Sequence, residues 1–386
     1  MWKKMFMAAL MCSAATAAQA QEELNMGAVV TLSGPGAAWG QGMLYAEQMA
    51  AEDVNKDGGL EVGGKKYKIN VTAYDDKYKA NEAVTAANRI VFEDGVKYII
   101  GTTGSAPALA IQPITEKNGV IIMMLAFTDK ALSPDKPYSF RPVLTTVETA
   151  TPMIKWLAQE KGVKRVGGLF VNDESGQQQH EWLSKAYEAA GIPLHATESF
   201  ERDRVDMVPL ITRLMAQNID AIDLNGISPS TAGLIAKQAR EMGFTGLLVR
   251  SGGPATEEIV NVAGAETVEG MLVYTQIDPS NEEVAAYAKR YQDTYGKAMN
   301  GFSPSFYDGT HMLFQAMQDA GTVTDVDKVR VALENIKDYD GILGTLNWTG
   351  KDTYGIDHQI DAPFFVSEVK DGKEVIRAKC TVDSCQ

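Results

Sequence analysis

Hydroxyl side chains and glycines gather where predicted strands give way to predicted helices. The glycine-rich segment 31–42 is the first such place, the segment 101–107 with Ser105 is the second, and Thr128 follows the third. The free N–H groups and the dipole of a helix start attract anions. Ser105 is expected at a helix N-cap, and both hydroxyls fall at the carboxyl edge of a sheet, where open α/β sheets bind ligands. These residues predict a pocket for a carboxylate.

Patterns for catalysis, metals and cofactors are missing or incomplete. In segment 31–42 the third glycine of a dinucleotide fingerprint, Gly40, comes one position late. No GxSxG or HExxH sequence occurs, and the four histidines stand apart, at His180, His195, His311 and His358. We therefore expect no catalytic residue, no metal ligand and no cofactor, and a periplasmic enzyme is the less favoured alternative.

The elements that must position these residues alternate between short β-branched runs and amphipathic helices, which is typical of parallel sheets in α/β proteins. In the first half we expect strands at 26–32, 69–74, 98–100 and 120–124, with helices at 39–55, 81–93 and 107–117. A second series then follows, with strands at 165–171, 194–199, 221–224, 247–250 and 270–274 and helices at 149–161, 177–190, 207–217 and 230–242. Helices at 282–295, 304–320 and 326–335 and strands at 363–369 and 375–378 are too few for a third domain and are expected to complete the first two.

The first twenty residues have the pattern of an export signal. Lys3 and Lys4 precede an apolar run that ends in the small-residue cleavage site Ala18–Ala20. We expect cleavage near Ala20 and a periplasmic mature protein. No later segment has about 18 uninterrupted apolar residues, as a membrane span would need.

Length, charge and cysteines narrow the class further. A chain of 386 residues, 45% of them hydrophobic, suggests two domains with proper cores. The formal net charge of −14 argues against a nucleic acid partner, which requires clustered Lys and Arg. Cys380 and Cys385 remain after cleavage and are expected to form a disulfide in an oxidising compartment.

Several segments, in this order and spacing, resemble the branched-chain amino-acid (leucine/isoleucine/valine) binding family of ABC importers. They are Gly27–Pro35, Trp39–Gly42, Ala51–Asn55, Gly101–Ser105, 120–128, 171–173, 236–243 and 306–308. The resemblance implies a type I two-lobed α/β fold, each lobe a parallel sheet flanked by helices. It places residues 21–141 and 274–346 in lobe 1 and residues 142–273 and 347–386 in lobe 2. Three hinge strands are implied near 141–145, 272–275 and 344–348.

The resemblance also implies that the protein binds a small ligand between its lobes and hands it to a membrane permease with cytoplasmic ATPases. The ligand-binding residues carried onto this sequence are Trp39, Ser105, Ala126, Phe127, Thr128, Ser175, Ile227, Ser228, Arg250 and Gly252.

The sequence departs from the family in lacking an acid near Gly252 to meet a ligand ammonium. A buried ammonium without an acidic partner is costly. We therefore expect a small carboxylate without an α-ammonium, aromatic or apolar in character. An aliphatic amino acid or amide is the alternative, with Asp223 or Arg250 as a substitute polar partner.

Overall fold

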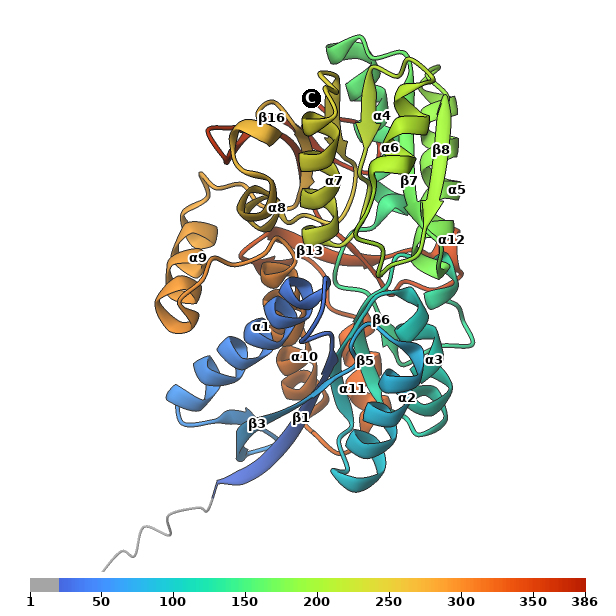
Figure 1. Cartoon of the computed structure of the whole chain (residues 1–386). Helices are drawn as coiled ribbons and strands as arrows, with labels where there is room; N and C mark the ends of the chain where they lie inside the picture. The colour runs from blue at the N-terminus through green and yellow to red at the C-terminus, as the bar shows by residue number, and fades with distance from the viewer. Residues whose placement is uncertain (1–20) are drawn as a thin grey trace, which may run out of the picture.

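The computed structural model describes residues 21–386, so the predicted signal segment 1–20 lies outside the described residues. The chain forms two α/β lobes, each built on its own sheet (Figure 1). This confirms the predicted two-lobed architecture.

The first sheet has the order β2-β3-β1-β4-β5-β6, and only the edge strand β2 runs antiparallel to its neighbour. Its strands are β1 (Glu22–Val30), β2 (Leu60–Val62), β3 (Lys65–Asp75), β4 (Tyr98–Thr103), β5 (Ile121–Leu125) and β6 (Ser139–Phe140). The second sheet has the order β16-β15-β11-β10-β9-β7-β8, in which the pairs β11–β15 and β15–β16 are antiparallel and the others are parallel. Its strands are β7 (Val166–Val171), β8 (Ala196–Phe200), β9 (Ala221–Asp223), β10 (Leu247–Arg250), β11 (Leu272–Thr275), β15 (Phe364–Lys370) and β16 (Lys373–Cys380).

The two sheets repeat one topological unit. The order β3-β1-β4-β5 in the first matches β8-β7-β9-β10 in the second, and in both the strand order reverses beside the first strand of the unit. The repeat extends to two glycines: a Cβ on Gly40 would lie 1.9 Å from the Thr31 carbonyl oxygen, and one on Gly176 would lie 1.9 Å from that of Val171. Each helix can therefore start tightly against its strand only with glycine at that position.

Helices cover both faces of the sheets. Their bounds are α1 (Ala37–Lys56), α2 (Ala80–Asn88), α3 (Ser105–Lys117), α4 (Thr146–Lys161), α5 (Glu174–Ala189), α6 (Val208–Met215), α7 (Pro229–Glu241), α8 (Thr256–Ala263), α9 (Glu282–Tyr295), α10 (Ser303–Ala320), α11 (Val326–Glu334) and α12 (Lys351–Tyr354). Late in the chain, α10 returns to pack beside α1, whereas β15 and β16 return to the second sheet (Figure 1). The prediction that the C-terminal pieces complete the two earlier units is confirmed.

The connections between the sheets differ in detail from the expected hinge. The first crossing follows β6, a strand of two residues that pairs with β5 just before the expected hinge strand at 141–145. Residues 272–275, expected as a crossing strand, form β11 within the second sheet, so the chain leaves that sheet only after Thr275. The third expected crossing, 344–348, lies in β13 (Gly344–Thr349), the middle strand of a small antiparallel sheet with β12 (Tyr339–Gly341) and β14 (Gln359–Asp361).

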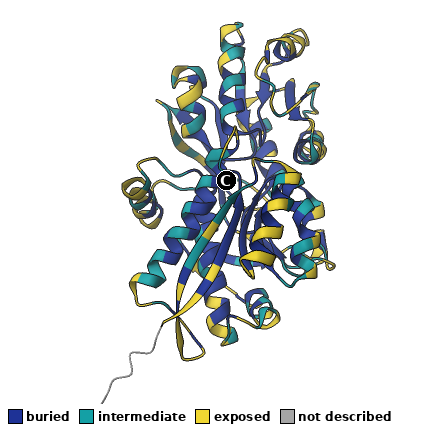
Figure 2. Ribbon diagram, turned by 60° about the horizontal axis from the view of Figure 1, so that its bottom comes forward, coloured by how far each residue is buried: buried dark blue, intermediate teal, exposed yellow. Residues whose placement is uncertain are grey.

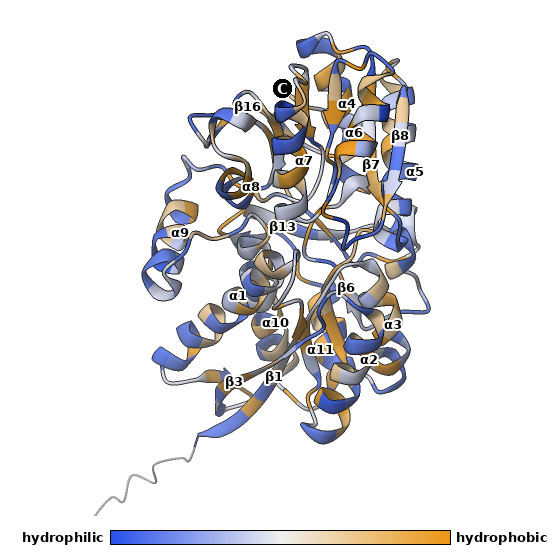
Figure 3. Cartoon of the chain, viewed as in Figure 1, coloured by the Kyte–Doolittle hydropathy of each residue, from blue (hydrophilic) through white to orange (hydrophobic). Residues whose placement is uncertain are grey.

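The strands form the interior of both lobes. All positions of β4, β5, β7 and β11 are buried, and Figure 2 shows the exposed residues mainly on the outer helices and loops. In Figure 3 the buried strand β7 is coloured as hydrophobic, while the outer helices carry hydrophilic residues. Strands buried on both faces explain the continuous apolar runs in the sequence.

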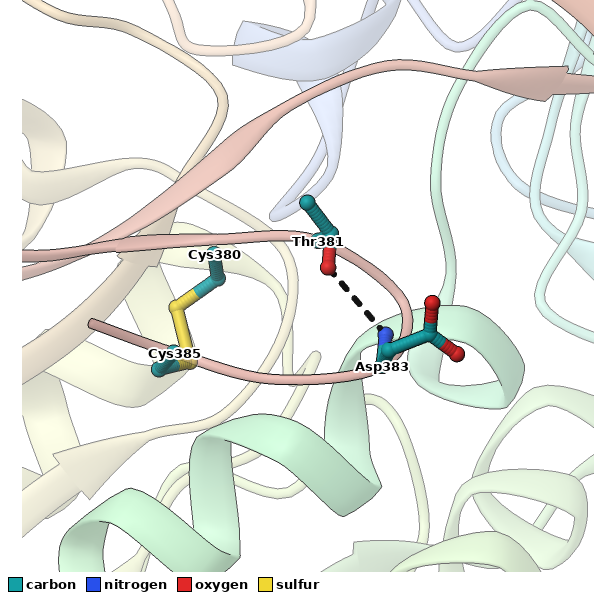
Figure 4. Close-up of a disulfide and its surroundings, with 4 residues drawn as sticks. All are labelled: Cys380, Thr381, Asp383 and Cys385. Carbon is teal, nitrogen blue, oxygen red and sulfur yellow. Dashed lines mark hydrogen bonds between the residues drawn. A yellow bond between two sulfur atoms is a disulfide. The ribbon is translucent and has the colours of Figure 1, made fainter.

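Cys380 at the end of β16 forms a disulfide with Cys385 (Figure 4). The short loop between them is held by a hydrogen bond from the Asp383 N–H to Thr381 Oγ1, at 3.3 Å. The pairing fastens the last residues back onto β16 and lies apart from the residues discussed below. Within residues 21–386, none of the helices is sufficiently long and apolar to cross a membrane.

Glu47 is an unusual residue of α1, because its side chain is fully buried and neither carboxylate oxygen has a hydrogen-bond partner. Burial raises the pKa of Glu47 well above its ordinary value of 4.5. A carboxyl group with a raised pKa in the folded state stabilises the fold least at high pH, because stability falls as the pH rises above the unfolded-state pKa.

Glu47→Met is therefore expected to increase the free energy of unfolding by about 1–3 kcal/mol at pH 8, with a smaller gain at pH 5. Urea unfolding at the two pH values measures this. Glu52→Gln, on the exposed side of the same helix, is the control and should change stability by roughly 0.5 kcal/mol or less. A loss of stability in Glu47→Met at both pH values would show that the buried carboxyl group stabilises the fold.

Candidate ligand-binding cleft

The carboxyl ends of the parallel strands of both sheets face each other across the space between the lobes, which we call the interlobe cleft. A cavity of about 470 Å³ is lined by Pro254–Glu258, Met299–Gly301 and Gly372–Glu374, among others, and by none of the predicted ligand-binding residues. Two hydrogen bonds join the lobes. The Trp39 Nε1–H donates to the Pro254 carbonyl oxygen at 3.3 Å, and the Ser105 N–H donates to Ser175 Oγ at 3.1 Å.

Ser105 is the first residue of α3, not its cap. Gly104 takes the N-cap position without any side-chain hydrogen bond, which corrects the predicted capping role of Ser105. The hydroxyl instead accepts hydrogen bonds from the N–H groups of Phe127 (3.0 Å) and Thr128 (3.1 Å). Both bonds use the oxygen as acceptor, so the hydroxyl proton is available for an acceptor at the start of α3. The Ser105 hydroxyl therefore contacts the backbone of residues 127 and 128, whereas the Thr128 hydroxyl faces Glu174.

The segment after β5 is held by a buried arginine that the sequence analysis did not identify. Arg141 Nη1 donates to the carbonyl oxygens of Ala126 (2.9 Å) and Thr128 (3.0 Å). Ala126 is buried in the core on the α2–α3 side of the sheet, so its side chain packs internally. The Thr128 hydroxyl lies 3.1 Å from Glu174 Oε1 of the second lobe. Arg141 thus holds the backbone of the loop 126–128, which carries the predicted ligand-binding residue Thr128.

Three aromatic rings pack together around the predicted ligand-binding residue Trp39. The Trp39 ring lies 6.4 Å from that of Phe127 and 5.8 Å from that of Phe302, measured between centroids, and Phe127 and Phe302 are 6.4 Å apart. All three side chains are buried. Phe302 was missed because it stands more than 260 residues after Trp39 and directly precedes α10. Only the return of α10 to the first lobe brings it here.

The second lobe contributes the ends of β9 and β10. The fully buried Arg250 donates from Nε to the Gly253 carbonyl oxygen and from Nη2 to that of Ile227, both at 2.7 Å. The Ile227 side chain packs in the core of the second lobe, and only its carbonyl group contacts Arg250. Ser228 Oγ donates to Thr231 Oγ1 at 2.9 Å inside α7. A Cβ on Gly252 would lie 3.2 Å from Thr146 at the start of α4.

Asp223, considered from the sequence as a substitute acid for a ligand ammonium, is occupied within its own lobe. Its carboxylate accepts from Tyr187 Oη (2.9 Å), the Asn225 N–H (2.7 Å) and Ser251 Oγ (2.9 and 2.8 Å). Burial raises its pKa above the ordinary value of 3.8. Asp223 therefore arranges the loops after β9 and β10 and has no hydrogen-bonding capacity left over for a ligand.

One rim of the cleft carries further contacts between the lobes. The Arg202 guanidinium lies 3.8 Å from the centroid of the Tyr78 ring and is ion-paired with Asp173. The Tyr78 hydroxyl reaches Ser175 Oγ at 3.5 Å, and Lys130 pairs with Glu174 at 2.9 Å. No sequence signal marked Tyr78, which stands in the turn after β3 with a φ of 58°.

The chain is similar to known proteins along most of its length. Residues 23–374 match the family model described as periplasmic binding protein. The chain belongs to this family. Among relatives of this periplasmic binding protein, the Leu/Ile/Val-binding protein of Escherichia coli K12 is 27% identical over 344 residues, which cover 86% of this chain and 88% of the relative.

Solved structures show the same fold. A leucine-binding protein from Thermotoga maritima superposes with a TM-score of 0.80 at 23% identity, covering 93% of this chain and 99% of that chain. A solute-binding protein of an ABC transporter from Rhodopseudomonas palustris, solved in complex with benzoate, superposes with a TM-score of 0.79 at 17% identity, covering 94% and 97%. The chain is thus a periplasmic binding protein by its family, and these solved structures show its fold.

Among the described residues, no group of three or more His, Cys, Asp or Glu side chains is arranged to hold a metal ion.

Proposed function

We propose that this periplasmic binding protein binds a small carboxylate of aromatic or apolar character in the interlobe cleft and delivers it to a membrane permease with cytoplasmic ATPases. In this proposal the export signal is cleaved near Ala20, residues 21–141 and 274–346 form lobe 1, and residues 142–273 and 347–386 form lobe 2. The protein acts as a receptor and catalyses no reaction.

The observation that carries the proposal is the arrangement at the start of α3. The Ser105 N–H and hydroxyl lie together at the positive end of the helix dipole, which favours a negatively charged oxygen. In the structure Ser175 Oγ accepts from the Ser105 N–H, so an oxygen atom at this position is stereochemically allowed. A ligand carboxylate oxygen would replace it and gain charge-assisted hydrogen bonds.

The aromatic rings of Trp39, Phe127 and Phe302 support an apolar or aromatic ligand body, because such rings bind apolar groups through contact area and edge-to-face packing. A cleft acid with spare hydrogen-bonding capacity would favour an amino acid instead, but Asp223 is saturated and Glu174 is paired with Lys130. The benzoate complex of the Rhodopseudomonas relative agrees with an aromatic acid.

The second candidate is an aliphatic amino acid or amide, because the sequence relatives are Leu/Ile/Val-binding proteins. Isothermal titration calorimetry with benzoate, phenylacetate, leucine and valine separates the two candidates. We expect heat of binding with the acids alone, and binding of leucine or valine without binding of the acids would favour the second candidate.

Ser105→Ala is expected to weaken binding of the preferred acid by about 1–3 kcal/mol, since it removes one donor to the carboxylate. Thr128→Val is expected to act in the same direction. Both are measured by calorimetry on the purified protein. Ser139→Ala is the matched control, because Ser139 is also buried but donates to Glu116 away from the cleft. If Ser105→Ala and Thr128→Val leave affinity unchanged, the carboxylate does not bind at α3.

A further inference from the structure

Arg250 stands out among the buried side chains because one of its donor groups is unused. Its Nε and Nη2 atoms donate to carbonyl oxygens of Gly253 and Ile227, whereas Nη1 is buried and has no hydrogen-bond partner. An unmade hydrogen bond on a buried charged group is more costly than one on a neutral group. A fold that retains such a donor is expected to use it for a ligand.

The positive charge of Arg250 is not balanced by an ion pair with any residue of the described part of the chain. Glu258 and Asp223 act on Arg250 as nearby charges without an ion pair, and the Asp223 carboxylate is already hydrogen-bonded within its own lobe. Burial lowers the pKa of Arg250 from its ordinary value of 12.5 to about 9, so the guanidinium is still protonated at neutral pH. A buried cation without a counter-ion is stabilised by an anion that enters with the ligand.

Arg250 also faces the site already described. Its guanidinium carbon lies 6.0 Å from the centroid of the Trp39 ring, which belongs to the opposite lobe. A Cβ on Gly253 would lie 2.9 Å from the Trp39 ring and 3.2 Å from Arg250 Nη2, so the glycine permits this close approach. The Arg250 side chain is therefore a part of the cleft wall that touches the aromatic cluster from the second lobe.

A neutral hydroxyl near Gly252 is unpartnered as well. Thr146 Oγ1 is buried without a hydrogen-bond partner. Thr146 starts α4, and a Cβ on Gly252 would lie 3.2 Å from the Thr146 methyl group. Thr146 therefore adds an unused hydroxyl beside the loop that follows β10.

We propose that Arg250 binds a second carboxylate of the ligand, so that the substrate class is a small dicarboxylate whose first carboxylate lies at Ser105 and whose apolar middle lies against Trp39. This inference rests on the proposed function, since it assumes a carboxylate at α3. The inference specifies that the end of the ligand opposite the first carboxylate is also negatively charged. One ligand molecule would then contact both lobes. Such a ligand favours the closed arrangement through its contacts with both lobes.

The unmodified protein provides the first test. Calorimetry compares terephthalate with 4-nitrobenzoate, which has the same shape but one negative charge fewer, and adipate with hexanoate. We expect a dicarboxylate to bind at least about tenfold more tightly than its monocarboxylate partner. Equal affinities within each pair would overturn the inference. The proposed function would still stand if the monocarboxylates bind and Ser105→Ala weakens them, and it would fail if none of these acids binds.

Arg250→Met and Arg250→Lys provide the second test. Arg250→Met is expected to remove the preference for the dicarboxylate, so that the affinities for terephthalate and 4-nitrobenzoate come within about threefold of each other, and Arg250→Lys to keep part of the preference. Arg240→Met is the matched control, because Arg240 also donates to carbonyl oxygens of the second lobe, at Phe244 and Gly246. An equal loss for both acids in Arg250→Met would mean that Arg250 does not bind a second carboxylate.

Thermal unfolding of each variant checks that it is folded. If Arg250→Met does not fold, the inference is tested by comparing the paired acids on the unmodified protein and on Arg250→Lys.

Discussion

Trp39→Ala is expected to weaken ligand binding at least about 100-fold, because the ring forms the centre of the apolar cluster with Phe127 and Phe302. The free energy of unfolding is expected to fall by about 3–5 kcal/mol, as for other buried aromatic side chains. Calorimetry with the preferred acid measures the first effect and urea unfolding the second.

Two controls separate the functions of the Trp39 side chain. Trp39→Phe keeps an aromatic face but loses the hydrogen bond from Nε1 to Pro254, and it should cost about 1 kcal/mol in binding. Trp182→Ala removes a tryptophan of α5 that packs against Lys185, outside the cluster, and should leave affinity unchanged. A tenfold or smaller loss of affinity in Trp39→Ala would place the ligand away from this ring.

The second large effect is expected at Arg141. Arg141→Met should lower the free energy of unfolding by about 3–5 kcal/mol, because it leaves buried carbonyl oxygens of Ala126 and Thr128 and the Glu148 carboxylate without their cation. The same change should weaken binding of the acid, since residues 126–128 supply the loop that contacts Ser105. Urea unfolding and calorimetry measure the two effects.

A double variant tests whether the unpaired Glu148 carboxylate causes the loss of stability in Arg141→Met. Glu148→Gln keeps an oxygen for the capping box with Thr145 but removes the charge, so Arg141→Met with Glu148→Gln should recover part of the lost stability. If the double variant is no more stable than Arg141→Met alone, the unpaired carboxylate is not the source of the loss.

The closed arrangement of the lobes depends on contacts that the ligand would share. Ser175 Oγ accepts from the Ser105 N–H, and Tyr78 packs against Arg202 across the cleft. Contacts of this kind hold the lobes together weakly by themselves, and a ligand that touches both lobes shifts the equilibrium by its differential affinity.

Much of the fold was predictable from the sequence because it depends on local patterns. The alternation of apolar runs and amphipathic helices predicted both sheets as two successive series of strands and helices, and the structure shows that the two series share one strand order. Several short elements were not predicted. They include β2 with three residues, β6 with two and α8 with eight. A pattern of a few residues has no measurable period, so such elements form only where neighbouring strands or helices support them.

The sequence alone determined that the polar groups stand at the carboxyl ends of strands, since strand, turn and helix follow one another within a few residues. It thereby predicted Ser105 and Thr128 as ligand-binding residues, while the family resemblance added Trp39. Only the tertiary structure decided which groups meet. It assigned Asp223 to internal hydrogen bonds, brought Phe302 to Trp39, and left Arg250 with a free donor beside that ring. The contacts of Trp39 with Phe302 and Arg250 join segments more than 200 residues apart, which no local pattern encodes.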